Sequence, residues 1–380
     1  YIPIPGIDPV AFAQAFQGQA SGILGMFNMF SGGAVERMAI FALNVMPYIS
    51  ASIIVQLLGA VYPPWEKLRK EGGEAGRKTL NQYTRYLTVV LAVVQSLGIA
   101  MGLSASQGLV QNPGPFFIIT TVVTLPGGTL FLMWLGEQLT SRGVGNGISL
   151  IIFIGIIAVL PRGIWQMFSM TRTGSLSGVG MLLIIGLAIA VVIAIVFMER
   201  SQRRLLVQYP KRQQGNRMVG GDTSFLPLKI NTAGVIPPIF ASSLLLLPTT
   251  IIGFAGLGAN TPEWVNQLQA FIGYGQPGHM ALYALGIIFF CFFYTSIVFN
   301  PDDTAENLRK YGGFLPGIRP GKRTAEYLDY VLTRLTVIGA AYITIVCLLP
   351  EALIGFYNAP FYLGGTSILI VVSVTMDTVA

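Results

Sequence analysis

Long apolar runs alternate with polar loops along almost the whole chain. The apolar runs cover residues 38–60, 86–103, 116–136, 147–160, 179–198, 232–252, 281–299, 335–349 and 363–380. Several of them reach the roughly 20 residues that a helix needs to cross about 30 Å of hydrocarbon, whereas 147–160 needs flanking residues to do so. Lipid cannot supply hydrogen bonds to the backbone of an open strand, and the alternating pattern of a membrane barrel is absent. Each run therefore predicts a membrane-spanning helix.

Basic residues are concentrated in every second loop. Loops 61–85, 137–146, 199–231 and 300–334 hold nearly all of the 23 Lys and Arg, and the intervening loops hold almost none. The positive-inside rule therefore places these four loops on the cytoplasmic side of a membrane. The composition agrees, because with 53% hydrophobic and 10% charged residues a soluble domain would expose too much apolar surface. The net charge of +7 is a property of the loops, not a nucleic-acid signature of the whole chain.

The apolar runs carry few groups that could do chemistry. Ionisable residues lie at their ends, as Glu137, Glu199, Arg334 and Glu351, with Asp377 near the end of the last run. Proton and ion relays need ionisable groups at mid-membrane, and an intramembrane protease needs paired aspartates or a nucleophile with a base. Neither set is present, which argues against an intramembrane enzyme. A secondary transporter of a small solute remains the alternative to a channel, because such transporters also use broken helices.

The two cysteines and the single histidine have ordinary structural interpretations. Cys291 and Cys347 lie in apolar runs without metal-ligand spacing, so we expect small buried apolar residues. His279 lies where an external loop meets a span, and we expect it to pack at that interface.

The first run does not begin cleanly. Residues 23–30 are apolar but too short to cross a bilayer, and Ser31-Gly32-Gly33 separates them from the longer run. We interpret this pattern as a short helix, a glycine joint and a full span, with an external lid as the alternative. Asn44 and Pro47 should distort the following helix near its middle. A discontinuous helix at membrane depth usually lines a cavity.

Ten short motifs follow one another along the chain. They are Met26-Phe-Asn-Met-Phe-Ser-Gly-Gly33, Met46-Pro-Tyr-Ile-Ser-Ala-Ser52, Gln82-Tyr-Thr-Arg-Tyr86, Trp134-Leu-Gly-Glu-Gln138, Gly143-Val-Gly-Asn-Gly147, Lys211-Arg-Gln-Gln-Gly215, Ala233-Gly-Val-Ile-Pro237, Phe299-Asn-Pro301, Pro316-Gly-Ile-Arg-Pro-Gly321 and Gly364-Gly-Thr-Ser367. In content and order they resemble the bacterial SecY family, the channel subunit of the Sec protein translocon. Against the family's ten spans, we expect this chain to lack the first span and the end of the last.

The resemblance implies an all-α membrane protein, a polytopic helix bundle of two pseudo-symmetric five-span halves around an hourglass pore. Residues 1–170 would form the N-terminal half, with a plug helix at about 23–36 and spans 2–5, and residues 171–380 the C-terminal half, with spans 6–10. The implied function is a protein-conducting channel of the bacterial plasma (inner) membrane, which passes unfolded secretory polypeptides and releases membrane segments laterally. It implies no catalytic residue, cofactor or metal, because a partner supplies the energy of ATP or GTP.

The resemblance also assigns residues to a plug and a pore ring. The plug residues would be Ile23, Met26, Phe27, Met29, Phe30, Gly32 and Gly33. The pore ring would be Val45, Ile49, Ile148, Ile152, Ile239 and Ile370. Val45 and Ile49, like Ile148 and Ile152, are one helical turn apart and share a face. A narrow aliphatic ring dewets and repels hydrated ions, yet its side chains can bend around a passing polypeptide. The alternative for each residue is an ordinary core or lipid-facing aliphatic.

A lateral gate and a docking surface complete the expected sites. The gate would contain Ser50, Gln95 and Asn231, with polar contacts between permanently packed helices as the alternative. The docking residues would be Lys211, Arg212, Arg217 and Arg319. They would bind the SecA motor ATPase or the translating ribosome through acidic protein surface or ribosomal RNA phosphates. Other implied partners are the SecE and SecG subunits, signal sequences and unfolded polypeptides, and membrane lipids, which the remaining basic residues would contact.

Overall fold

Helices make up most of the computed structural model, which describes residues 1–17, 28, 31–105, 108–219, 221–255, 262–273, 275–357 and 365–380. The helices are α1 (Pro9–Gln17), α3 (Met46–Val61), α4 (Pro63–Lys70), α5 (Gly73–Ala105), α6 (Pro115–Arg142), α7 (Gly147–Arg172), α8 (Gly178–Arg200), α9 (Ile236–Ala255), α10 (Glu263–Ile272), α11 (Pro277–Val298), α12 (Pro301–Lys310), α13 (Lys322–Tyr357) and α14 (Gly365–Val379).

The predicted spans and the observed helices correspond. Within the described residues, six helices are long and apolar enough to cross a membrane, and the bent pair of α3 and α4 raises the number to seven. Two further apolar helices are shorter, Ile236–Leu245 within α9 and Gly365–Val379, which is α14. Every apolar run therefore contains a helix, which confirms a helical membrane protein. The helices often extend beyond the runs: α7 continues through Pro161 to Arg172, and α13 begins in the basic loop at Lys322.

The predicted start of the first span is wrong. We expected a helix over 38–60 with a distortion at Pro47, but α3 starts only at Met46 and residues 31–45 form turns. Met38 and Asn44 adopt left-handed φ angles of 47° and 49°, which a continuous helix cannot contain. Pro47 lies in the first turn of α3, where a missing N–H costs nothing, so it begins the helix instead of kinking it.

Local sequence signals set several helix ends. Asn146 caps α7 by accepting hydrogen bonds from the backbone N–H groups of Ile148 (3.1 Å) and Ser149 (3.5 Å). Ser177 caps α8 in the same way, through the N–H of Gly180 at 3.1 Å. Tyr62, which precedes Pro63, is extended, and the chain bends by 96° between α3 and α4. The bend turns the basic helix α4 away from the direction of the apolar helix α3.

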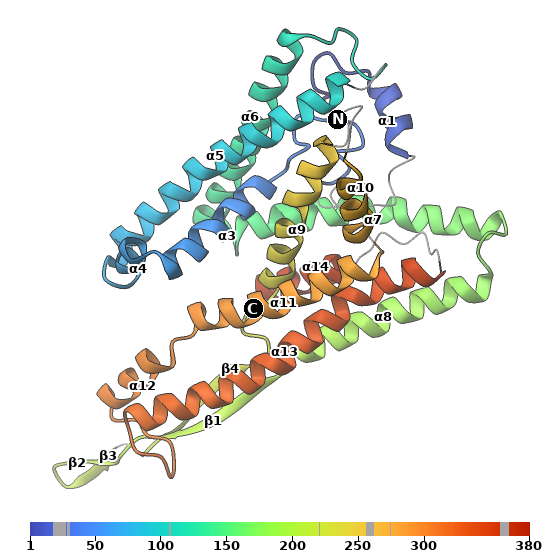
Figure 1. Ribbon diagram of the computed structural model, residues 1–380. Helices are drawn as coiled ribbons and strands as arrows, with labels where there is room; N and C mark the ends of the chain where they lie inside the picture. Colours follow the sequence, from blue (N-terminus) through green and yellow to red (C-terminus); the bar gives the residue numbers. More distant parts are fainter. Residues whose placement is uncertain are drawn as a thin grey trace.

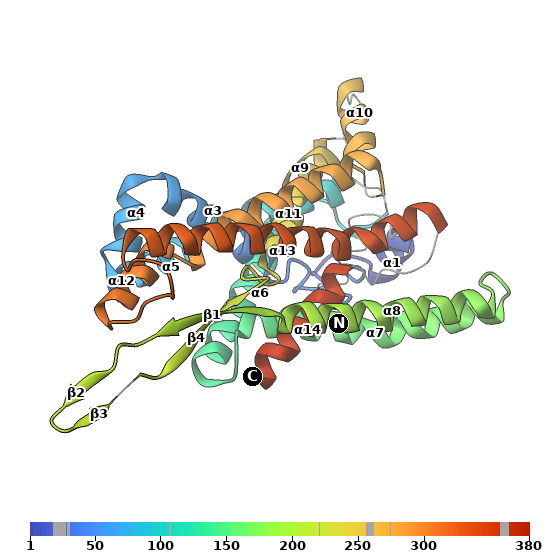
Figure 2. The same ribbon diagram turned by 90° about the horizontal axis from the view of Figure 1, so that it is seen from below.

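A β-hairpin, which the hydropathy pattern did not predict, emerges from the long basic loop between α8 and α9. Strands β1 (Gln202–Gln208) and β4 (Thr223–Lys229) pair antiparallel, and β2 (Arg212–Gln214) pairs with β3 (Arg217–Val219) beyond them. Figures 1 and 2 show the hairpin projecting from the helices beside α12. The hairpin therefore forms an extension that carries part of the basic loop 199–231 away from the helices (Figure 1).

Helices that precede residue 173 contact helices that follow residue 235 in two places. On one side, α3 and α5 both contact α9, and on the other side α7 contacts α14. In Figure 1, α3, α5 and α6 lie above, α8, α11 and α13 lie below, and α9 runs between the two groups. The ends of α3, α7, α9 and α14 are thereby brought toward a common centre.

Glycines permit the closest approaches between segments. A Cβ atom on Gly128 of α6 would collide with the carbonyl oxygen of Ile40 and lie 3.2 Å from the ring of Phe41. A Cβ on Gly365 of α14 would likewise collide with the carbonyl oxygen of Val346 on α13. Small residues of this kind drive helix association in lipid, where the solvent is as apolar as the side chains.

Replacing Gly128 with Ala should therefore destabilise the protein, because the new methyl group must displace the backbone at Ile40. The expected cost is about 1–3 kcal/mol, typical of overpacking. The neighbouring Gly127 has open space where its Cβ would stand, so Gly127→Ala is the matched control. The measurement is the thermal unfolding midpoint of both variants in detergent. Equal midpoints for the two variants would contradict the inferred contact.

Candidate functional site

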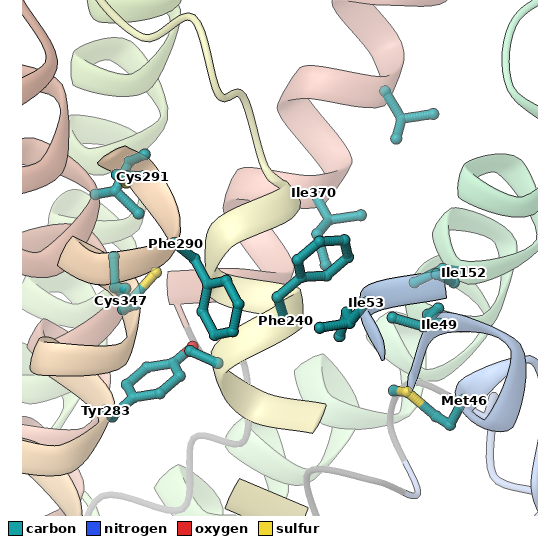
Figure 3. Close-up of a cluster of buried hydrophobic side chains, with 14 of the residues drawn as sticks. Met46, Ile49, Ile53, Ile152, Phe240, Tyr283, Phe290, Cys291, Cys347 and Ile370 are labelled. Carbon is teal, nitrogen blue, oxygen red and sulfur yellow. The ribbon is translucent and has the colours of Figure 1, made fainter. Parts of the chain in front are cut away.

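The six expected pore-ring residues lie in one apolar cluster. Val45 precedes α3, Ile49 lies on α3, Ile148 and Ile152 on α7, Ile239 on α9 and Ile370 on α14. Val45, Ile49, Ile152 and Ile370 are buried, at most 6% exposed, and Ile148 and Ile239 are partly buried against them. Figure 3 shows Ile49, Ile152 and Ile370 converging from three helices. We call this group and its neighbours the aliphatic cluster.

Helix geometry explains why each pair of residues reaches the cluster together. The backbone N–H of Ile49 donates to the carbonyl of Val45 at 3.1 Å, so the turn that begins α3 aligns the two side chains. Ile148 and Ile152 repeat the same spacing within α7, just after its Asn146 cap. The expected face-sharing is therefore present in both segments.

Aromatic residues that the sequence analysis did not assign also belong to the aliphatic cluster. Phe240 and Phe290 pack edge to face with ring centroids 5.7 Å apart, and Tyr283 lies in the same group. Figure 3 places Phe240 between Phe290 and the isoleucines. Phe240 directly follows Ile239 in the sequence, but no periodicity separates it from the other aromatics of the spans.

Most of the expected plug falls outside the described residues. Ile23, Met26, Phe27, Met29 and Phe30 belong to this group. Gly32 and Gly33 are described and have left-handed φ angles of 69° and 86°, as a glycine joint requires. The predicted plug helix of about 23–36 is wrong for residues 31–36, which form turns.

The segment after the glycine joint rests on α7. The ideal Cβ position of Gly32 lies 3.3 Å from the Cα of Gly155, so the two backbones approach closely. Arg162, two turns further along α7, forms an ion pair of 2.8 Å with Glu36. The side chain of Asn28 accepts a hydrogen bond from the backbone N–H of Glu36 at 2.9 Å. Gly32 and Glu36 therefore contact α7, and Asn28 is hydrogen-bonded to Glu36.

The three expected gate residues are not joined by any hydrogen bond within the described part of the chain. Ser50 is buried on α3, and Gln95 is half-buried on α5. Asn231 is 5% exposed, and its amide donates to Glu199 Oε1 at 2.7 Å and to the carbonyl of Gly234 at 3.2 Å. Asn231 therefore binds the end of α8 rather than reaching toward α3 or α5.

The expected docking residues lie on two adjacent cytoplasmic projections. Lys211 is exposed just before β2, Arg212 and Arg217 lie on β2 and β3, and Arg319 is exposed in the loop between α12 and α13. The carbonyl of Arg319 accepts a hydrogen bond from the hydroxyl of Thr324 at 2.9 Å, which fixes its turn to the start of α13.

The two projections form one unit. Gln208 and Phe314 exchange backbone hydrogen bonds of 2.9 and 3.0 Å, which joins β1 to the loop of Arg319. Beneath this bridge a second hydrophobic cluster packs both projections on α13, with Val207, Leu228 and Leu328 at its centre. Although the sequence separates the two basic segments by about a hundred residues, the fold makes them neighbours.

A buried polar pair connects α11 and α13 near their external ends. His279 Nδ1 lies 2.7 Å from Glu351 Oε1, and the two side chains are 8% and 3% exposed. From the sequence we expected only interfacial packing for His279. Among the described residues, no group of three or more His, Cys, Asp or Glu side chains is placed to hold a metal ion.

The comparisons with known proteins agree with the family suggested by the motifs. A family model described as SecY matches residues 39–379. The protein translocase subunit SecY of Escherichia coli K12 is 55% identical over 383 residues, which cover all of this chain and 86% of that protein. The same subunit of Rickettsia bellii is 53% identical over 385 residues, covering all of this chain and 87% of that protein.

Two solved structures share the fold. One, described as the structure of a protein conducting channel, has a TM-score of 0.67 and 18% identity, and the match covers 93% of this chain and 83% of the other. A SecY structure described through its plug domain has a TM-score of 0.65 and 18% identity over all of this chain and 93% of the other. With more than half of its sequence shared with full-length relatives and a family model matched along nearly its whole length, this chain belongs to the SecY family.

Proposed function

We propose that this chain forms the protein-conducting channel of a Sec translocon in the bacterial inner membrane, as a multi-pass subunit. Unfolded secretory polypeptides would cross the membrane through it, and apolar segments would leave it sideways into lipid. The observation that carries this proposal is the convergence of six aliphatic residues from four separated segments in one buried cluster. A ring of this kind excludes ions by dewetting and needs no fixed binding chemistry.

A secondary transporter of a small solute fits the site less well. Such proteins bind their solutes and coupling ions near mid-membrane through polar groups and broken-helix termini. The six side chains that converge in the aliphatic cluster are isoleucine and valine instead. The channel moves its cargo without chemistry of its own, so its energy must come from a partner.

The two halves proposed from the family, 1–170 and 171–380, are consistent with the contacts. Under this division α3, α5 and all but the last two residues of α7 belong to the first half, and α9 and α14 to the second. The contacts of α3 and α5 with α9 would then form the seam that opens to lipid, and that of α7 with α14 would lie nearer the hinge. We also propose that residues 23–36 act as a plug, since Gly32 and Glu36 contact α7, the helix that carries Ile148 and Ile152.

The ring assignment predicts a leak. Replacing Ile49 and Ile152 together with Ser should wet the constriction and raise the resting ion conductance in planar bilayers. Leu58 on α3 and Ile154 on α7 are 43% and 60% exposed, so Leu58→Ser with Ile154→Ser is a control on the same two helices. Conductance equal to the parent in the Ile49/Ile152 variant, at normal abundance, would rule out this ring.

The gate proposal rests on Ser50, Gln95 and Asn231 lying on or next to helices that meet at the seam. Asn231 would act indirectly, by fixing the start of α9 to Glu199. Polar contacts between membrane helices are worth only about 0.6 kcal/mol on average, which suits a seam that must open.

Replacing Asn231 with Leu should loosen the start of α9 and change the export ratio between precursors with weak and strong signal sequences. The assay compares the two precursors in the same proteoliposomes. Glu199→Gln is the control, since its amide oxygen can still accept the hydrogen bond from Asn231. If both precursors lose export to the same degree in Asn231→Leu, the change reports general damage and not a gate.

The hairpin and the loop of Arg319 form the proposed docking surface for SecA or the ribosome. Lys211 and Arg319 are exposed on a unit that is internally hydrogen-bonded and packed on α13. A preorganised basic projection loses little entropy when it binds an acidic protein surface or RNA phosphates. SecE and SecG would be the other subunits, and they would pack on exposed apolar helix faces.

Reversing the charge of Arg319 should weaken partner attachment while leaving membrane insertion and resting conductance intact. Arg319→Glu should lower cosedimentation with SecA or ribosomes, flatten its dependence on salt and abolish SecA-driven transport. Arg323→Glu changes the net charge equally but lies on the first turn of α13, so it separates a local contact from a general charge effect. Parent-like binding and transport in Arg319→Glu would remove this loop from the docking surface.

A further inference from the structure

The hydroxyl of Tyr283 joins two helices that carry expected ring residues. Tyr283 lies on α11, and its hydroxyl is hydrogen-bonded to the hydroxyl of Thr366 on α14 at 2.8 Å and to that of Ser242 on α9 at 3.2 Å. The three side chains are deeply buried, since Tyr283, Thr366 and Ser242 are 4%, 2% and 7% exposed. We call this arrangement the hydroxyl bridge.

The hydroxyl bridge lies one helical turn from two ring residues. Ser242 follows Ile239 by three residues on α9, and Thr366 precedes Ile370 by four residues on α14. Residues three or four apart on a helix stand on the same face, so a displacement of either anchor moves the neighbouring isoleucine with it. The bridge therefore couples the positions of Ile239 and Ile370.

The ring of Tyr283 is itself held in place. His279, one turn earlier on α11, stacks on it with ring centroids 6.1 Å apart and an interplanar angle of 18°. His279 is in turn hydrogen-bonded to Glu351 on α13 at 2.7 Å. Tyr283 also packs within the aliphatic cluster, where Figure 3 shows it beside Cys347 and Phe290. Its hydroxyl thus occupies a defined point between α9 and α14.

We propose that Tyr283 is a positioning residue of the channel, whose hydroxyl fixes the spacing of Ile239 and Ile370 and thereby sets both the ion seal and the apolarity that a signal segment needs for opening. The proposal rests on the channel function and ring assignment above. A polar tie is suited to this role, because dispersion contacts among aliphatic side chains have no preferred direction, whereas hydrogen bonds between three hydroxyls do.

Replacing Tyr283 with Phe tests the proposal, since it removes the hydroxyl and keeps the ring that stacks on His279. We expect resting conductance several-fold above the parent, and a higher export ratio of weak-signal to strong-signal precursors at normal abundance. Tyr342 on α13 provides the matched control. Its hydroxyl is also buried but has no hydrogen-bond partner among the described residues, so Tyr342→Phe should behave as the parent.

Two further variants separate positioning from general stability. Thr366→Val keeps the shape of the side chain and removes the same hydrogen bond, so it should reproduce both effects. Because Tyr283→Phe already removes the hydrogen bond that Thr366→Val breaks, the two combined should leak no more than the stronger single variant. Ser242→Ala tests the other arm and carries the experiment if the Tyr283 variant does not assemble. A merely structural role would lower export of both precursors equally without raising the leak, and that result would overturn the proposal.

The Ile49/Ile152 double variant separates failure of the ring assignment from failure of the proposed role of Tyr283. If it leaks while Tyr283→Phe, Thr366→Val and Ser242→Ala all remain sealed with unchanged export ratios, the hydroxyl bridge is not a positioning device, although the ring stands. If the ring variant is itself sealed, the ring assignment fails and the role of Tyr283 fails with it.

Discussion

The meeting of α3, α7, α9 and α14 at one aliphatic cluster is the contact on which the rest of this structure depends. In lipid such a meeting gains nothing from the hydrophobic effect between helices, because the surrounding solvent is as apolar as the side chains. It must be held by close backbone packing and by a few polar ties. Gly365 against Val346 is a contact of the first kind, and the hydroxyls of Ser242, Tyr283 and Thr366 are contacts of the second.

The combination of an aliphatic cluster with a few polar ties suits a channel that has to open. The six aliphatic residues contact one another by dispersion, so in the proposed channel they can part around a polypeptide of any sequence. The ties lie beside the cluster or at the helix ends, as with Asn231 and Glu199 at the cytoplasmic end of α8. These contacts therefore position the helices from outside the group of six aliphatic residues.

The hairpin and the loop of Arg319 are held together by a different kind of contact. The hairpin β1–β4 and the loop of Arg319 are surrounded by water, so hydrophobic burial can join them, and Val207, Leu228 and Leu328 do so against α13. The backbone exchange between Gln208 and Phe314 adds direction to that packing. Basic side chains from two separate loops are thus presented on one support.

Hydropathy and charge predicted the spans and their orientation, because insertion into a membrane depends on the composition of each span and its flanking loops and not on tertiary contacts. The same pattern failed at residues 38–45, where an apolar stretch forms turns, since apolarity reports burial and not the φ angles of Met38 and Asn44. It also missed the hairpin, whose strands are too short to give an apolar run as long as that of a span. Helical spacing correctly paired Val45 with Ile49 and Ile148 with Ile152, because those pairs are local.

The sequence by itself determined that this is a helical membrane protein of the SecY family, with its basic loops on one side and with isoleucines spaced to share helix faces. Only the tertiary structure decided that isoleucines from four segments meet, that Asn231 binds Glu199 instead of reaching across to α3, and that the hydroxyl of Tyr283 joins α9 to α14. The reason is physical. Insertion into lipid depends on each segment's own composition, whereas the partner of a buried polar group depends on which helices pack together, and that is a property of contacts between residues far apart in the chain.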